Sequence, residues 1–131
     1  MKLVVNATLG ASIVAFGEAL ALATSLGLDR TAVLDVLAES AIGPSVRAKR
    51  ANVEASHYPP SFKLRHATKD MRLVIEAAEA AGLDLKEARA ACAWLDEAVQ
   101  HGAADLDYSA VLATILSTAD RTRGRAKQKI P

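Results

Sequence analysis

The sequence is poor in the residues that form cross-links, turns and large aromatic cores. Cys92 is its single cysteine, and tryptophan, tyrosine and phenylalanine together make up 4% of its 131 residues. One cysteine excludes an internal disulfide and a multi-cysteine metal site, and it fits a reducing compartment. Glycines number only seven and prolines four, whereas 51% of the residues are apolar. This composition argues against disorder over most of the chain and favours a single domain with one core.

The sequence patterns of several large enzyme classes are also missing. No segment alternates apolar and polar residues for long enough to predict a strand. The sequence also lacks the glycine-rich phosphate-binding motif that follows a strand in dinucleotide-binding and nucleotide-binding folds. The three histidines, His57, His66 and His101, are too scattered to predict a metal site, so we expect none. A formal net charge of +1 gives no overall attraction for nucleic acid, which we do not expect as a partner.

Apolar residues at helical spacing predict an all-α fold of about six helices packed around a long N-terminal helix. The first helix is the longest apolar run and is expected to end at Gly27, after which Asp29 caps the second. The predicted helices span residues 1–27, 30–40, 45–53, 62–81, 85–101 and 106–119. We assign residues 1–120 to this helical domain. Residues 121–131 hold five basic residues and no acidic one, and we expect them to form a disordered tail.

The apolar N-terminal run is superficially similar to a secretory signal, because Lys2 precedes an apolar stretch that contains small residues. Asn6 and Glu18 interrupt that stretch. A carboxylate at the centre of a bilayer costs about 2.5–3.5 kcal/mol. We therefore expect a soluble, cytoplasmic protein without a membrane partner.

The start of the first helix is unusual for a helix that begins there. A lysine in the first turn faces the positive end of the helix dipole, and no Ser, Thr, Asp or Asn precedes Lys2 as an N-cap. Both features are explained if the helix continues upstream. We therefore expect the chain to be a fragment of a longer protein.

Lys2 and Asn6 form the first of two candidate sites. They are four residues apart, so they share one face of the first helix. A lysine whose pKa is lowered by burial can exchange a proton with a hydroxyl or carbonyl oxygen, and an asparagine can orient a substrate through its amide. The alternative interpretation is a solvated, frayed helix end.

Phe62, His66, Lys69 and Asp70 form the second candidate site. Positions 62, 66 and 69 fall on one face of the predicted fourth helix, so an aromatic ring, an imidazole and an ammonium group are expected to line up. The alternative interpretation is a solvated helix face with a local ion pair between Lys69 and Asp70.

Four short motifs occur in the order and spacing of a known family. Two of them contain the candidate residues, as Lys2-x-x-x-Asn6 and as Phe62 followed, after six intervening residues, by Lys69-Asp70. The other two are Glu18-Ala19 with Ala23 and Gly27-Leu28-Asp29, and His101-Gly102 with Asp105, Asp107 and Ser109-Ala110. Over residues 1–118 the chain thus resembles the C-terminal helical domain of the β-hydroxyacid dehydrogenases, the group that contains 3-hydroxyisobutyrate dehydrogenase and tartronate semialdehyde reductase.

This resemblance implies NAD(P)-dependent oxidation of a small hydroxy acid, or reduction of its semialdehyde. It implies that Lys2 is the catalytic acid and base, that Asn6 binds substrate, and that Phe62, Lys69 and Asp70 lie on the cofactor side. In this family NAD or NADP is held by an N-terminal Rossmann domain that this sequence does not include, so we expect the chain to be inactive alone. The resemblance also implies a homodimer formed through the helical domain. A lysine at position 2 favours hydroxyacid chemistry over the imine reduction of a related group.

Two other interpretations stay open at this point. One is a stand-alone helical module that dimerises or binds a partner without catalysis. The other takes the basic residues 121–129 as a nucleic-acid tail, although a short basic run is more often a solvated chain end.

Overall fold

Six α-helices and two short helical turns make up residues 1–128, the part of the chain that this computed structural model describes. The first three helices are α1 (Lys2–Ser25), α2 (Arg30–Ala38) and α3 (Gly43–Ala55). They are followed by α4 (Leu64–Ala80), α5 (Lys86–Ala98), η1 (Val99–Ala103), η2 (Tyr108–Ala110) and α6 (Val111–Gln128). The only β-type pairing within residues 1–128 is an isolated bridge between Lys63 and Asp107. The predicted all-α fold built on a long first helix is confirmed.

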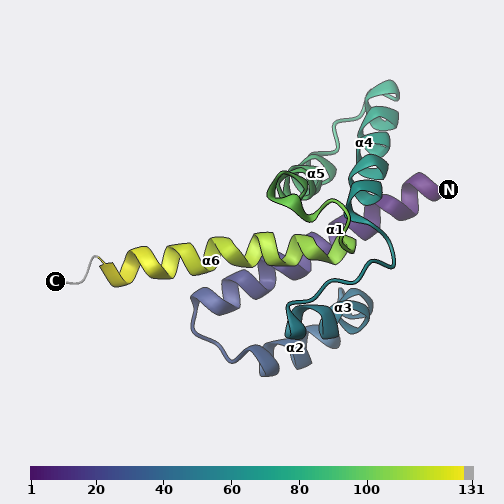
Figure 1. Cartoon of the computed structure of the whole chain (residues 1–131). Coiled ribbons are helices and arrows are strands. Elements are labelled where there is room, and N and C mark those ends of the chain that lie inside the picture. The colour runs from purple at the N-terminus through teal and green to yellow at the C-terminus, as the bar shows by residue number, and fades with distance from the viewer. Residues whose placement is uncertain (129–131) are drawn as a thin grey trace.

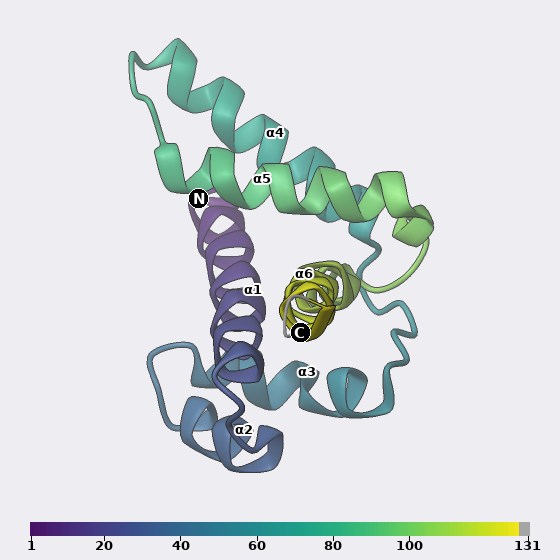
Figure 2. The same cartoon turned by 90° about the vertical axis from the view of Figure 1, so that its left-hand side faces the viewer.

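The helices α1 and α6 run side by side through the middle of the molecule (Figure 1). On one side of this pair lie α4 and α5, and on the other lie α2 and α3 (Figure 2). The first turn of α1 and the last turn of α6 are at opposite ends of the molecule (Figure 1). Each outer pair buries its apolar face against the central pair, so one core serves the whole domain.

The core forms where apolar side chains at helical spacing face one another. In α1, Ile13, Phe16 and Leu20 are fully buried, and Gly17 between them lets α6 approach closely. A Cβ added to Gly17 would lie only 2.5 Å from Ile115 Cδ1. The largest buried side chains from the other helices are Leu34, Val46, Val53, Leu64, Met71, Leu95, Val111, Leu112 and Ile115. Their burial supplies most of the driving force for folding.

Local signals set the ends of several helices. The Asp29 carboxylate accepts a hydrogen bond from the Ala32 N–H at 2.9 Å, so the predicted N-cap of the second helix is confirmed. Gly27 and Gly82 follow α1 and α4 with φ of 73° and 76°. Glycine adopts this left-handed conformation without the steric cost that a side chain brings.

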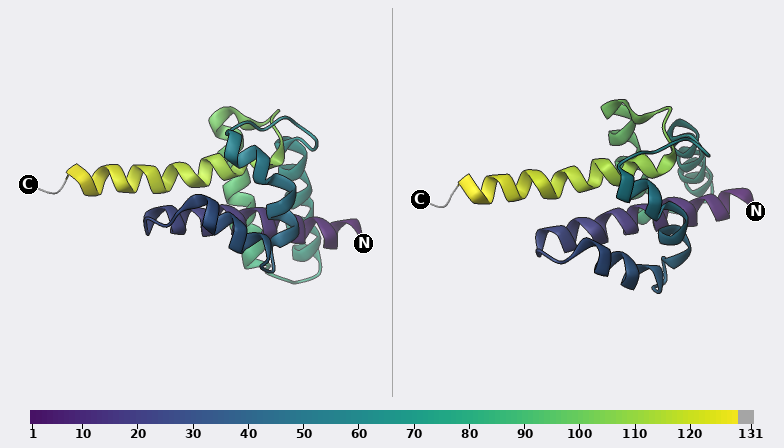
Figure 3. Two further views of the ribbon diagram at one scale, coloured as in Figure 1. Left: turned by 90° about the horizontal axis from the view of Figure 1, so that it is seen from below. Right: turned by 60° about the horizontal axis from the view of Figure 1, so that its bottom comes forward.

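The last helix extends further than predicted. We expected it to end near Ala119 and a tail to begin at residue 121, but α6 continues to Gln128 (Figure 3). Arginine, lysine, alanine and glutamine are good helix formers. Arg125 and Lys127 lie in the last turn, where their positive charges stabilise the negative end of the helix dipole. The predicted helix end was therefore too early. Residues 129–131 of the predicted tail lie outside the described part of the chain.

Other helix ends differ from prediction by a few residues. The third helix begins at Gly43, the fourth begins at Leu64 rather than Phe62, and α5 ends at Ala98 before the wider turn η1. Gly102, with φ of 91°, breaks the helical path there, so the predicted helix to residue 101 does not form as one element.

Only α1, among the described residues, is long and apolar enough to cross a membrane. Its central residues Ile13, Phe16 and Leu20 are buried against other helices of the fold. A core helix passes the same test of length and composition, so this is weak evidence for a membrane span.

Candidate functional site

The two predicted clusters meet where the start of α1 packs against α4. Asn6 Nδ2 donates a hydrogen bond to Asp70 Oδ2 at 3.2 Å, joining residues 64 positions apart in the sequence. Gly10, one turn after Asn6, makes this contact possible, because a Cβ there would lie 2.6 Å from Met71 Sδ. The absence of a side chain at residue 10 thus leaves room for Met71 of α4 to pack against α1, one turn from the contact between Asn6 and Asp70.

A small crevice lies beside this contact. Its walls include Asn6 and Asp70 on one side and the rings of Phe62 and Tyr108 on another. Its cavity volume is about 10 Å³, which is room for roughly one water molecule. The described residues therefore form one wall of a possible site and do not enclose a substrate.

Phe62 forms part of an aromatic group at the edge of the crevice. Its ring stacks on His66, with centroids 6.3 Å apart and planes 30° apart. It also meets the edge of Tyr108, with centroids 6.0 Å apart. Phe62 precedes α4 instead of lying in it, but it still lies beside His66, as the spacing predicted.

The two lysines of the predicted sites are exposed. Lys2 lies one turn before Asn6 at the start of α1, and residues 1–128 do not bury it. Lys69 is exposed on α4. The alternative interpretation of this cluster placed a local ion pair between Lys69 and Asp70, whereas in the structure Asp70 accepts a hydrogen bond from Asn6. With its N–H donated to Asp70, Asn6 can still accept a hydrogen bond through Oδ1.

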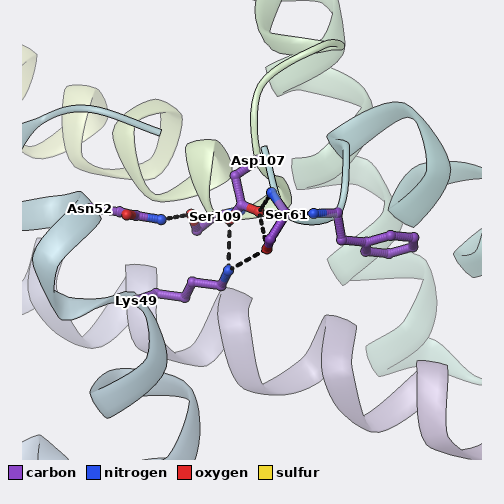
Figure 4. A network of polar contacts seen from close by, with 6 residues as sticks. Lys49, Asn52, Ser61, Asp107 and Ser109 are labelled. Atoms are coloured by element: carbon purple, nitrogen blue, oxygen red, sulfur yellow. Dashed lines mark hydrogen bonds and ion pairs between the residues drawn. The ribbon is translucent and has the colours of Figure 1, made fainter. Parts of the chain in front are cut away.

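A buried carboxylate, Asp107, lies at the centre of a polar network that includes Lys49, Ser61 and Ser109 (Figure 4). Asp107 Oδ1 accepts from the backbone N–H of Ser61 at 3.1 Å and of Phe62 at 3.2 Å, and from the Ser61 hydroxyl at 3.0 Å. Asp107 Oδ2 accepts from Lys49 Nζ at 3.0 Å. It also accepts from the N–H and the hydroxyl of Ser109, at 3.1 and 2.5 Å. Every side of this carboxylate therefore has a donor.

These donors decide the protonation state of Asp107. Burial favours the neutral acid, but hydrogen bonds from Ser109, from Lys49 and from two backbone N–H groups outweigh it. Together they hold the pKa of this carboxyl well below its usual range. Asp107 is therefore ionised at neutral pH, and it makes a charge-assisted contact with Lys49.

The sequence analysis did not identify this network as a unit. Asp107 and Ser109 belonged to one of the four motifs, and their spacing is that of a side chain that caps a turn. Lys49 and Ser61 gave no such signal, because each meets Asp107 only across the folded chain.

The described residues do not by themselves fit a dinucleotide. The crevice is far too small, and residues 1–128 contain no strand followed by a glycine-rich phosphate loop. Nor do three His, Cys, Asp or Glu side chains gather anywhere in this part of the chain to hold a metal ion.

The family described as the NAD-binding region of NADP-dependent 3-hydroxyisobutyrate dehydrogenase matches residues 1–115. Glyoxylate/succinic semialdehyde reductase 1 of Arabidopsis thaliana is 37% identical over 116 residues, which are 88% of this chain and 40% of that protein. The chloroplastic reductase 2 of the same plant is 34% identical over 122 residues, covering 92% of this chain and 34% of its own.

Two solved structures with a similar fold are both named 3-hydroxyisobutyrate dehydrogenase. A 3-hydroxyisobutyrate dehydrogenase from Salmonella typhimurium superposes with a TM-score of 0.80 and 27% identity, over 86% of this chain and 40% of that one. The Mycobacterium tuberculosis 3-hydroxyisobutyrate dehydrogenase, solved with L-serine, has a TM-score of 0.74. At 24% identity over 87% of this chain and 42% of that one, it shows the shared fold. This chain spans less than half the length of each of these four proteins.

Proposed function

Because this chain belongs to the family of the NAD-binding region of NADP-dependent 3-hydroxyisobutyrate dehydrogenases, we propose that it is the helical domain of an NAD(P)-dependent hydroxyacid dehydrogenase. Family membership agrees with the resemblance that the four motifs predicted. The observation that carries the proposal is the contact between Asn6 and Asp70. It joins one residue from each predicted cluster at the N-terminal end of α1.

The reaction is the interconversion of a small hydroxy acid and its semialdehyde or ketone. The two plant relatives are named for reduction of glyoxylate and succinic semialdehyde, so these aldehydes are the first substrates to test. NAD or NADP, when bound, supplies or accepts the hydride at the substrate carbon.

Lys2 is the residue that exchanges the proton at the substrate oxygen. In reduction its ammonium group donates a proton to the carbonyl oxygen, and in oxidation its amine takes the proton of the hydroxyl. Asn6, one turn further along the same helix face, holds the substrate through its amide. Phe62, Lys69 and Asp70 belong to the cofactor side of the site.

The roles proposed for these residues require a second domain. Lys2 is exposed, and the apolar residues beside it, Val4 and Val5, are 66% and 57% exposed. A dinucleotide-binding domain that covers this end of α1 would bury both the apolar surface and the lysine. We therefore propose that the helical domain alone does not turn over substrate.

A second exposed apolar surface supports pairing with another copy of the chain. A groove of about 470 Å³ lies between the end of α1 and α2, lined mainly by apolar side chains, among them Leu22, Leu26 and Val36. Leu26 and Val36 are 65% and 71% exposed. Apolar surface of this kind is typical of a contact between subunits, and we propose that it forms a homodimer.

The catalytic assignment is tested by replacing Lys2 in the protein as the native cell makes it, recovered through an affinity tag. We expect Lys2→Ala to lower kcat for aldehyde reduction by about 10²–10⁴-fold, the usual contribution of a positioned acid or base. Lys86→Ala is the matched control, because Lys86 is also an exposed lysine in the first turn of a helix. The assignment is wrong if Lys2→Ala and Lys86→Ala have the same kcat.

A further inference from the structure

The Asp107 carboxylate joins three parts of the chain at one point. Its Oδ1 holds the connector between α3 and α4, residues 56–63, through the N–H groups of Ser61 and Phe62. Its Oδ2 holds Lys49 on α3 and Ser109 at the start of the last helical segment. Since Asp107 is fully buried, these contacts are shielded from water and are stronger than they would be on the surface.

Lys49 closes this network on its outer side. Its Nζ lies 3.0 Å from Asp107 Oδ2 and donates to Ser61 Oγ at 3.2 Å. It also lies 4.8 Å from the centre of the Tyr108 ring, within the range of a cation–π contact. Lys49 therefore supports both the connector and one of the aromatic walls of the crevice.

The backbone of Phe62 is fixed on both sides. Its N–H donates to Asp107 Oδ1, and its carbonyl accepts from the Tyr108 N–H at 2.8 Å. With the backbone fixed at this point, the ring stacks on His66 and lines the crevice beside Asn6 and Asp70.

We propose that Asp107, together with Lys49, is a positioning residue that sets the Phe62 ring against the crevice formed by Asn6 and Asp70. Neither Asp107 nor Lys49 lines that crevice. They act through Phe62, whose ring is the part of the connector that reaches the site. The placement of the ring is independent of any activity, whereas its effect on turnover rests on the proposed function.

The placement is tested by nuclear magnetic resonance on the 131-residue chain. The ring-proton signals of His66 report the position of Phe62, because a stacked aromatic ring shifts the resonances of its neighbour. The chain has only three histidines, so these signals are easily separated. Phe62→Leu defines the shift that follows loss of the ring.

We expect Asp107→Ala to move the His66 signals in the same direction as Phe62→Leu. Asp107→Asn keeps an oxygen for the Ser61 and Phe62 N–H groups and should restore much of the wild-type position. Lys49→Met should give a smaller shift in the same direction. Lys49→Met leaves every backbone N–H donor to Asp107 in place, so it keeps the test decisive if Asp107→Ala does not fold.

Asn52→Ala is the matched control. Asn52 Nδ2 donates to Ser109 Oγ at 3.0 Å, on the opposite side of Asp107 from Ser61 (Figure 4). Its side chain belongs to the same network but makes no hydrogen bond to the connector, and the Asn52 carbonyl, which accepts from the His57 N–H, is kept in the alanine variant. The proposal is overturned if the Lys49 and Asp107 variants leave His66 unchanged. It is equally overturned if Asn52→Ala shifts His66 as much as Lys49→Met, or if Phe62→Leu itself gives no shift.

In the active protein, Lys49→Met should raise KM for the nicotinamide, because Phe62 is proposed to lie on the cofactor side, with little change in kcat, whereas Asn52→Ala should change neither. A displaced contact residue can lower kcat/KM by up to about 100-fold. If the wild-type protein turns over no aldehyde, the proposed function fails, and the resonance test still decides whether Asp107 positions Phe62.

Discussion

Gly17 is the point where α1 lets α6 come close, and replacing it with alanine tests how tightly this core is packed. A Cβ added there would lie 2.5 Å from Ile115 Cδ1, and 3.3 Å from both Ile115 Cβ and Leu112 Cδ2. The Cδ1 methyl could rotate away, but the other two atoms move only if a buried side chain or the helix moves. Forcing a methyl group into such a core costs about 1–3 kcal/mol. Replacing a helical glycine by alanine returns about 1 kcal/mol. We therefore expect Gly17→Ala to lower the free energy of unfolding by about 0–2 kcal/mol.

Gly124→Ala is the matched control, because it makes the same change in α6 where no atom lies within 4 Å of the added Cβ. This variant should raise the free energy of unfolding by up to about 1 kcal/mol. The two variants should thus differ by about 1–3 kcal/mol, or roughly 4–12 °C in Tm for a domain of this size. Urea and thermal unfolding followed by circular dichroism measure both quantities.

A double variant identifies the clash. Ile115→Val removes the Cδ1 methyl group that lies nearest to the added Cβ. Gly17→Ala should therefore cost less in the Ile115→Val background than in the wild type, with a coupling of about 0.5–3 kcal/mol. The packing argument is refuted if Gly17→Ala stabilises the protein as much as Gly124→Ala does.

Two further predictions concern acid stability and assembly. Folding lowers the pKa of Asp107, so the ionised carboxylate stabilises the fold above its unfolded pKa of about 4, and this stabilisation is lost as the pH falls below that value. Asp107→Asn should therefore have a lower free energy of unfolding than the wild type at pH 7, and urea titrations should show the difference between the two proteins becoming smaller below about pH 4. A difference that does not change with pH would contradict the ionised state of Asp107. Val36→Glu, in the apolar groove, should convert a dimer to a folded monomer in sedimentation equilibrium, because a carboxylate there would lose water on pairing. Leu83→Glu is the control, since Leu83 is 57% exposed and does not line the groove; equal assembly of the two variants would argue against this surface.

Most of the fold could be predicted from local patterns in the sequence. The spacing of apolar residues gave the number and order of the helices, and Asp29 and Gly27 marked two of their ends. The errors lie where local preference was misjudged. Residues 121–128 were taken for a tail because they are charged, although most of them are good helix formers. Gly102 was taken for a helix end, but the helical path already widens at Val99.

The candidate site was predictable only in part. The helical face that Lys2 shares with Asn6 follows from sequence spacing, as does the neighbourhood of Phe62 and His66. The contact of Asn6 with Asp70 does not, because it depends on the close approach of α1 to α4 at Gly10. Lys49 could not be identified at all, since its role depends on a partner 58 residues away, at Asp107.

The central claim is that this domain works in nicotinamide-dependent hydroxyacid chemistry. Its most direct test is to recover the chain from its native cells and to follow the oxidation of NADPH and NADH with glyoxylate and with succinic semialdehyde. The account predicts oxidation of at least one nicotinamide that depends on the added aldehyde. A recovered species that neither binds the nicotinamides nor oxidises them with either aldehyde would contradict it.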